Sequence, residues 1–184
     1  MCKTLGALKL GFVLYLSFCS TTAAQVVASP QVSTPRMESS GDLGEDRAVV
    51  RDCLNRASSL GELQTCLDLV QARCWASLPT GDNETTAQQR WCHLRSSLAW
   101  EGELEVTMSQ LRELLGPPSL AQLLIAQRAW EETVSADTKV FLGVIDDNVM
   151  GGAEAAGVRA RAIAERVVFL EYVMLMAELN ANAN

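Results

Sequence analysis

The architecture of the chain follows from residues 91–130, WCHLRSSLAWEGELEVTMSQLRELLGPPSLAQLLIAQRAW. Apolar side chains recur in and just beyond this segment mostly at steps of three or four residues, which is the spacing of amphipathic helices. The first run is Trp91, Leu94, Leu98, Leu104, Met108, Leu111 and Leu115, and the second is Leu120, Leu123, Leu124, Trp130, Val134, Phe141 and Ile145, with the polar Gln127 in line with them. Between them, Gly116 suits the left-handed position that ends a helix, and the two prolines after it cannot continue one. The segment therefore predicts a long helical hairpin.

Composition and charge limit the classes of fold and partner. The chain has 184 residues, 48% of them hydrophobic, which is enough for one domain with a genuine core. Its formal charge is −7, and without Lys3 and Lys9 of the leader it carries 13 basic against 22 acidic residues, or −9. This charge repels phosphate backbones and anionic membranes, so we expect no nucleic-acid partner and favour a basic protein. The alternative is that the acidity only keeps the chain soluble.

The N-terminus resembles a secretory signal. Lys3 and Lys9 precede the apolar run 10–18, and small residues at 22–24 follow it, which predicts a signal peptide over 1–24. The run is too short to span a bilayer, so we expect a periplasmic or secreted protein without membrane insertion after cleavage. Lipid anchoring at Cys19 is an alternative that the bulky Phe18 disfavours, and an uncut signal anchor is another.

The rest of the chain divides by composition. Residues 25–46 are rich in Pro, Ser, Thr, Gly and acids, which is typical of a flexible linker, although an extended arm would also fit. A helical domain is expected over 47–178, with a polar tail over 179–184. We expect two short N-terminal helices and three longer ones, in an all-α, disulfide-stapled bundle built around the hairpin.

Four cysteines remain once Cys2 and Cys19 leave with the leader. They are Cys53, Cys66, Cys74 and Cys92, an even number that favours disulfides in an oxidising compartment. Cys66 and Cys74 are eight residues apart on one expected helix, about 12 Å of rise, which no disulfide can bridge.

Helical symmetry selects the pairing. The short helices are expected at 47–57 and 62–75, and Cys53 and Cys66 lie nearly equidistant from the turn between them. Cys74 and Cys92 lie nine residues on either side of Asn83, in the next polar connection. Antiparallel neighbours therefore predict the disulfides Cys53–Cys66 and Cys74–Cys92, each worth about 2 to 4 kcal/mol.

Polar residues interrupt the apolar stripes at three places. Glu101 falls among the leucines of the first hairpin arm, Gln127 lies in line with Trp130, and Arg166 interrupts the last helix. Polar groups on a core face need partners, so we expect a Glu101–Arg166 ion pair joined by Gln127. The network would fix helix register, and a binding or catalytic role is the alternative.

Catalytic and metal-binding patterns are absent from the sequence. No Cys-x-x-Cys spacing occurs and His93 is the only histidine, so neither a metal site nor a cofactor is expected. His93 and Cys92 are adjacent on a helix and diverge by about 100°, which prevents a Cys-His catalytic pair. We expect no enzyme, with a hydrolase using paired carboxylates as the alternative.

Five motifs together resemble the lysozyme inhibitor LprI-like family over residues 53–170. They are Glu84-Thr85-Thr86 leading to Cys92, Ala99-Trp100-Glu101 with Leu104, Ala126-Gln127-Arg128-Ala129-Trp130, Gly151-Gly152, and Ala164-Glu165-Arg166 with Leu170. The resemblance implies an exported, disulfide-bonded helical domain whose characteristic acid, Gln and Arg fall on Glu101, Gln127 and Arg166. It also marks Trp100, Trp130, Gly151, Gly152 and Glu165 as motif positions.

The chain departs from the family at one pair of cysteines. Their positions correspond to residues around Val134–Thr138 and to Val158, so both members of one bridge are missing together. Glu101 also stands where Asp is usual. The resemblance implies an envelope or periplasmic module that inhibits a basic lysozyme by noncovalent occlusion. The alternative is an envelope structural or adaptor protein that binds another protein through its helix faces.

Overall fold

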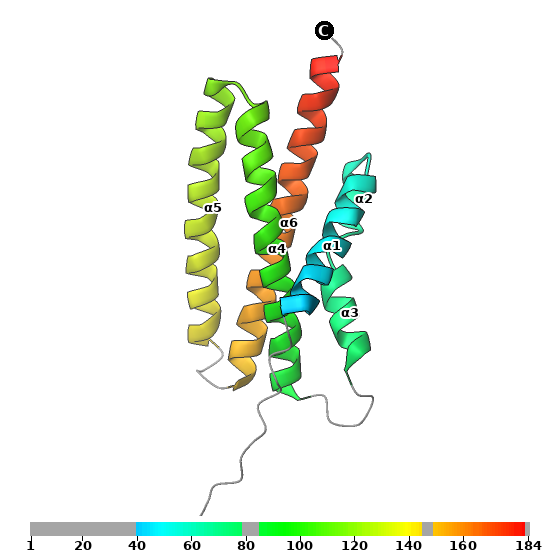
Figure 1. The fold of residues 1–184 in the computed structure, drawn as a ribbon. Coiled ribbons are helices and arrows are strands. Elements are labelled where there is room, and N and C mark those ends of the chain that lie inside the picture. Colours follow the sequence, from blue (N-terminus) through cyan, green and yellow to red (C-terminus); the bar gives the residue numbers. More distant parts are fainter. Residues whose placement is uncertain (1–39, 79–84, 145–148, 183–184) are drawn as a thin grey trace, which may run out of the picture. The chain divides into compact units, whose positions relative to one another are not determined.

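All regular elements in the described part of the chain are helices (Figure 1). The computed structural model describes residues 40–78, 85–144 and 149–182. The helices are α1 (Ser40–Arg56), α2 (Leu60–Gln64), α3 (Leu69–Ser77), α4 (Thr86–Leu114), α5 (Pro117–Val144) and α6 (Val149–Asn182). The predicted all-α, disulfide-stapled fold is thus confirmed. The predicted signal peptide 1–24 and the part 25–39 of the predicted linker lie outside the described residues.

The predicted hairpin is formed by α4 and α5. α4 begins with a capping box, in which the Thr85 hydroxyl accepts from the Gln88 main-chain N–H and the Gln88 side chain accepts from that of Thr85. α4 ends at Leu114, and the following C-cap residue Leu115 has extended backbone, with φ −87° and ψ 134°. Gly116 does not take the expected left-handed conformation. Pro117 begins α5, where its missing N–H leaves no hydrogen bond unmade.

Both predicted disulfides are confirmed. Cys53 is bonded to Cys66 with a Cα–Cα distance of 5.9 Å, and Cys74 to Cys92 with 5.5 Å. The second expected short helix is divided into α2 and α3 by a turn at residues 65–68. At its start the Thr65 hydroxyl donates to the Glu62 carbonyl oxygen at 2.7 Å, a local bond that competes with a continuing helix.

The most extensive packing joins α4 to α6, which run in the same direction. His93 faces Gly157 and Thr107 bonds Glu171, so both contacts join residues 64 positions apart. The core between the helices contains small and β-branched residues around the fully buried Trp100. α5 packs on α6 at the edge and buries only Leu123 and Gln127 in the described ranges.

Two boundaries differ from the sequence-based expectation. α1 begins at Ser40, so the end of the predicted linker is helical, because Asp46 is fully buried and pairs with Arg95 of α4. α6 extends through Asn182, into the predicted tail. Residues 151 and 152 lie within the first turn of α6.

Candidate functional site

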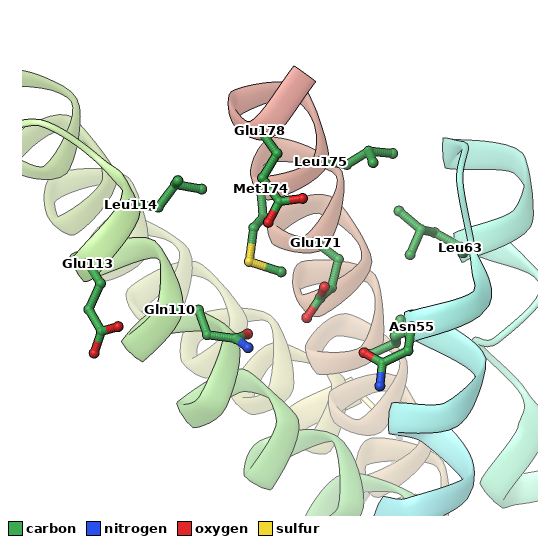
Figure 2. Close-up of a pocket in the computed structure, with 11 residues that line it drawn as sticks. Asn55, Leu63, Gln110, Glu113, Leu114, Glu171, Met174, Leu175 and Glu178 are labelled. Carbon is green, nitrogen blue, oxygen red and sulfur yellow. The ribbon is translucent and has the colours of Figure 1, made fainter. Parts of the chain in front are cut away.

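A concavity lies between the α1–α2 corner and the C-terminal halves of α4 and α6. Its volume is about 520 Å³. Figure 2 shows Glu171, Met174 and Glu178 extending from α6 and Gln110 from α4. Asn55 of α1 and Leu63 of α2 lie across the cavity from α6. The lining is completed by Leu54, Ala57, Glu113, Leu114 and Leu175. Three carboxylates and two amides therefore share the cavity with apolar side chains, and no basic side chain lines it.

Glu171 connects this cavity to the protein interior. Its residue is 7% exposed, and its Oε1 accepts a hydrogen bond from the Thr107 hydroxyl at 2.6 Å. The Thr107 oxygen also lies 2.9 Å from the main-chain carbonyl oxygen of Glu103, one turn earlier on α4. Its i, i+4 spacing from Glu103 places Thr107 on the α4 face that meets α6.

Arginines from α1 balance the buried acids. Arg51 pairs with Glu103, and its Nη1 lies 3.7 Å from Glu171 Oε1. Arg47 Nε lies 3.8 Å from the same Glu103 carboxylate. Burial raises the pKa of Glu103, and the charges of Arg51 and then Arg47 oppose that rise. Because Glu103 does not line the cavity, the carboxylates that meet solvent there are Glu113, Glu171 and Glu178.

Part of the network expected from sequence is formed between α5 and α6. Arg166 Nε donates to Gln127 Oε1 at 2.9 Å, and Gln127 Nε2 donates to Glu131 Oε1 at 3.1 Å. The Arg166 guanidinium also lies over two aromatic rings, 5.7 Å from the centroid of Trp130 and 5.4 Å from that of Phe169. Burial lowers the pKa of Arg166, and the charge of Glu131 opposes that change.

The expected Glu101–Arg166 ion pair is wrong. Glu101 Oε1 accepts from Arg159 Nη2 at 3.0 Å and from the Ser97 hydroxyl at 3.4 Å. The Glu101 side chain is 37% exposed, so Arg159 can reach it from the solvent side. Arg166 donates to Gln127 instead. Glu101 and Gln127 do share the lining of a smaller cavity of about 380 Å³ between α4 and α5.

The remaining motif positions do not converge on one site. Trp100 is fully buried in the core and its Nε1 has no hydrogen-bond partner in the described part of the chain. Trp130 is half-buried beside Arg166, Glu165 is exposed, and the glycines Gly151 and Gly152 begin α6. These positions therefore serve the core, the surface and a helix start separately.

Sequence reasoning missed Arg51, Glu103, Thr107 and Glu171. A signal was present, because Glu103, Thr107 and Leu111 follow Trp100 at steps of three or four residues and share its helix face. The sequence-based prediction places Glu101 in the core. Glu101 lies two positions from Glu103 and about 200° away around the helix, so the two acids cannot share one face.

No family model matches the chain, and no curated protein or solved structure matches it. The resemblance to the LprI-like family therefore rests on the motif residues alone. The two disulfides are typical of oxidising compartments outside the cytoplasm. Within the described ranges, no helix is long and apolar enough to cross a membrane.

Proposed function

We propose that the chain is an exported periplasmic or secreted protein-binding module, most specifically an LprI-like inhibitor of a basic lysozyme. Binding would occlude the partner noncovalently, without a chemical step and without a cofactor. The observation that carries the proposal is the acid-lined cavity, whose three carboxylates have no basic residue beside them in the lining. The charge of −9 after leader removal supports it, because an acidic surface steers a basic partner toward itself.

The test is a titration of lysozyme turnover and lysozyme binding with the oxidised, leader-free protein at two salt concentrations. We expect inhibition that weakens at the higher salt concentration, because exposed charges are screened there. The variant Glu113→Gln/Glu178→Gln should inhibit less than wild type. The control Glu105→Gln/Glu132→Gln makes the same charge change at exposed positions outside the cavity and should inhibit more strongly than the cavity variant. Undiminished turnover at high micromolar protein, for several lysozyme types, would contradict the proposal.

A second candidate function is an envelope adaptor, and the outer face of α5 favours it. Ile125, Val140 and Val144 are 63%, 65% and 78% exposed on this helix. Val140 and Val144 lie one turn apart, and contiguous exposed apolar side chains, unlike single ones, mark surfaces that bind another protein. A pull-down from periplasm that recovers one partner other than lysozyme, and loses it with Ile125→Gln/Val140→Gln, would support the adaptor. Equal recovery with the variant would exclude this face.

A further inference from the structure

α6 has two apolar faces, and α4 covers only one of them. The covered face buries Ala160, Ile163, Val167 and Leu170. The opposite face, which we call the α6 seam, consists of Val158, Ala162, Glu165, Phe169, Tyr172, Met176 and Leu179. A helix that is apolar on both sides is normally buried on both sides. In the described part of the chain, however, no helix covers the α6 seam.

The spacing of the seam is that of a coiled coil. Its steps alternate between four and three residues from Val158 to Leu179, which is a heptad repeat along about 32 Å of helix. The large apolar side chains of the seam are exposed, with 38% for Val158, 51% for Phe169, 39% for Met176 and 54% for Leu179. Isolated exposed apolar residues are ordinary, whereas a contiguous line of them marks a surface that binds another chain.

Hollows flank the seam on both sides, since α6 lies between α5 and α2 (Figure 1). On the α2 side, a cavity of about 650 Å³ is lined by Leu60 and Leu67. On the α5 side, a cavity of about 370 Å³ is lined by Trp130 and Val134. Phe169 lines both cavities. A helix that packs along the seam would insert its own side chains into these hollows, as knobs enter holes in a coiled coil.

The seam is complementary in size to a second copy of itself that runs antiparallel. In a symmetric pair, each contact between two different residues occurs twice. When Phe169 faces Tyr172 of the second copy, the same register sets Glu165 against Met176 and the small Ala162 against Leu179. The aromatic rings then meet at the centre, and a small side chain meets a large one at each end. Aromatic pairs of this kind stabilise an interface beyond the area that they bury.

The charges beside the seam also favour the antiparallel arrangement. The N-terminal half of the seam is flanked by three arginines, which are Arg159, Arg161 and Arg166. Residues 173–182 of the C-terminal half contain no basic residue and one acid, Glu178. Antiparallel packing therefore sets the basic half of each copy against a half without basic residues. Parallel packing would instead place Glu165 against its own copy and Arg161 beside Arg166, so that like charges meet.

We propose that the α6 seam is a dimer interface, in which a second copy of the chain packs its own α6 antiparallel across Phe169 and Tyr172. The proposal is independent of lysozyme inhibition, because the seam shares no residue with the acid-lined cavity. Each leader-free copy carries a charge of −9, and salt screens the repulsion between the two copies. Salt should therefore strengthen the dimer, whereas it should weaken the binding of a basic protein.

Sedimentation equilibrium of the oxidised, leader-free protein at micromolar concentrations tests the proposal. We expect a dimer that dissociates less at the higher of two salt concentrations. Met176→Glu should weaken the dimer at least about tenfold, because each new carboxylate faces Glu165 of the other copy. Met176→Lys should weaken it far less, because an ammonium then faces the same carboxylate. Circular dichroism verifies that both variants keep the helical fold.

The matched control is Leu94→Glu on α4, because Leu94 is 40% exposed and Met176 is 39% exposed. This variant should leave the dimer close to wild type. Equal losses for Leu94→Glu and Met176→Glu would overturn the seam as the interface. Equal losses for Met176→Lys and Met176→Glu would overturn the antiparallel register.

The state of the wild-type protein separates this proposal from the proposed function. A monomer at high micromolar concentration would overturn the dimer and leave the α6 seam to another protein. A monomer that inhibits lysozyme would refute the dimer alone, and a dimer that does not inhibit lysozyme would refute the proposed function alone.

Discussion

The substitution Gly157→Ala tests a close contact between α4 and α6. A Cβ built on Gly157 would lie 2.9 Å from His93 Cε1 and 3.1 Å from both ring nitrogens. The ring packs against Trp75 on one side, at 6.3 Å between ring centroids and 86° between ring planes, and on another it lines an open cavity of about 460 Å³. The neighbouring Cys92 is also tied to Cys74. The added methyl group must therefore displace the imidazole, α6 or both.

Two opposing effects set the magnitude. Replacing glycine by alanine inside a helix stabilises it by about 1 kcal/mol. Overpacking a fitted contact costs about 1 to 3 kcal/mol. Because three ring atoms meet the new methyl group, we expect the packing cost to win, with a net loss of about 1 kcal/mol in the free energy of unfolding. Gly44→Ala is the matched control, since nothing lies within 4 Å of its Cβ in α1, and it should gain about 0.5 to 1 kcal/mol.

Urea unfolding of the oxidised protein, followed by circular dichroism, measures both variants. We expect the two midpoints to move in opposite directions from wild type. Adding His93→Ala to Gly157→Ala should recover part of the loss, which a double-mutant cycle with the single variants quantifies. If Gly157→Ala stabilises the protein as much as Gly44→Ala does, the proposed contact between the imidazole and α6 is refuted.

Three further predictions concern the disulfide, the histidine and the α5–α6 contact. Replacing Cys74 and Cys92 together by alanine opens a loop of 18 residues and should lower the free energy of unfolding by about 3 kcal/mol, measured by urea denaturation, and an unchanged midpoint would contradict this. Burial lowers the pKa of His93 from its usual 6.5, so the unfolded chain binds a proton there more readily and stability should fall as pH drops through 6.5 toward the folded pKa. His93→Phe should flatten this part of the stability curve between pH 7 and 5, and parallel curves would exclude the effect. Gln127→Leu leaves Arg166 Nε without its acceptor and should cost about 1 to 3 kcal/mol in urea denaturation, whereas a loss below 0.5 kcal/mol, on the order of a surface substitution, would contradict this.

Sequence reasoning succeeded where local rules decide the outcome. The hairpin follows from apolar periodicity on either side of Gly116-Pro117-Pro118, and the disulfides follow from the distances of cysteines from two turns. Both depend on residues close together in the chain. The N-terminal boundary failed because residues 40–46 are polar and acidic, yet Asp46 is fully buried against Arg95, 49 positions away. A long-range ion pair of this kind overrides the local preference for disorder.

The candidate cavity could not be predicted because it depends on how α6 returns to α4. Spacing alone shows that Glu103 and Thr107 share a helix face with Trp100. It does not show that Arg51 of α1 and Glu171 of α6 contact that face of α4. The Glu101–Arg166 prediction used the same physical rule, that core polar groups need partners, with the wrong acid. Glu103 follows the rule in place of Glu101, because it pairs with Arg51, whereas Trp100 Nε1 does not follow it.

The buried polar contacts also select the register of α4 against α6. A slip of one turn would replace Glu171 opposite Thr107 by Val167, Met174 or Leu175. The Thr107 hydroxyl would keep the Glu103 carbonyl oxygen as an acceptor, but the Glu171 carboxylate would lose its one hydrogen-bond donor among the described residues. A buried polar group that loses its hydrogen bond costs more free energy than an apolar contact of similar size contributes. The Thr107–Glu171 hydrogen bond therefore disfavours the slipped arrangements.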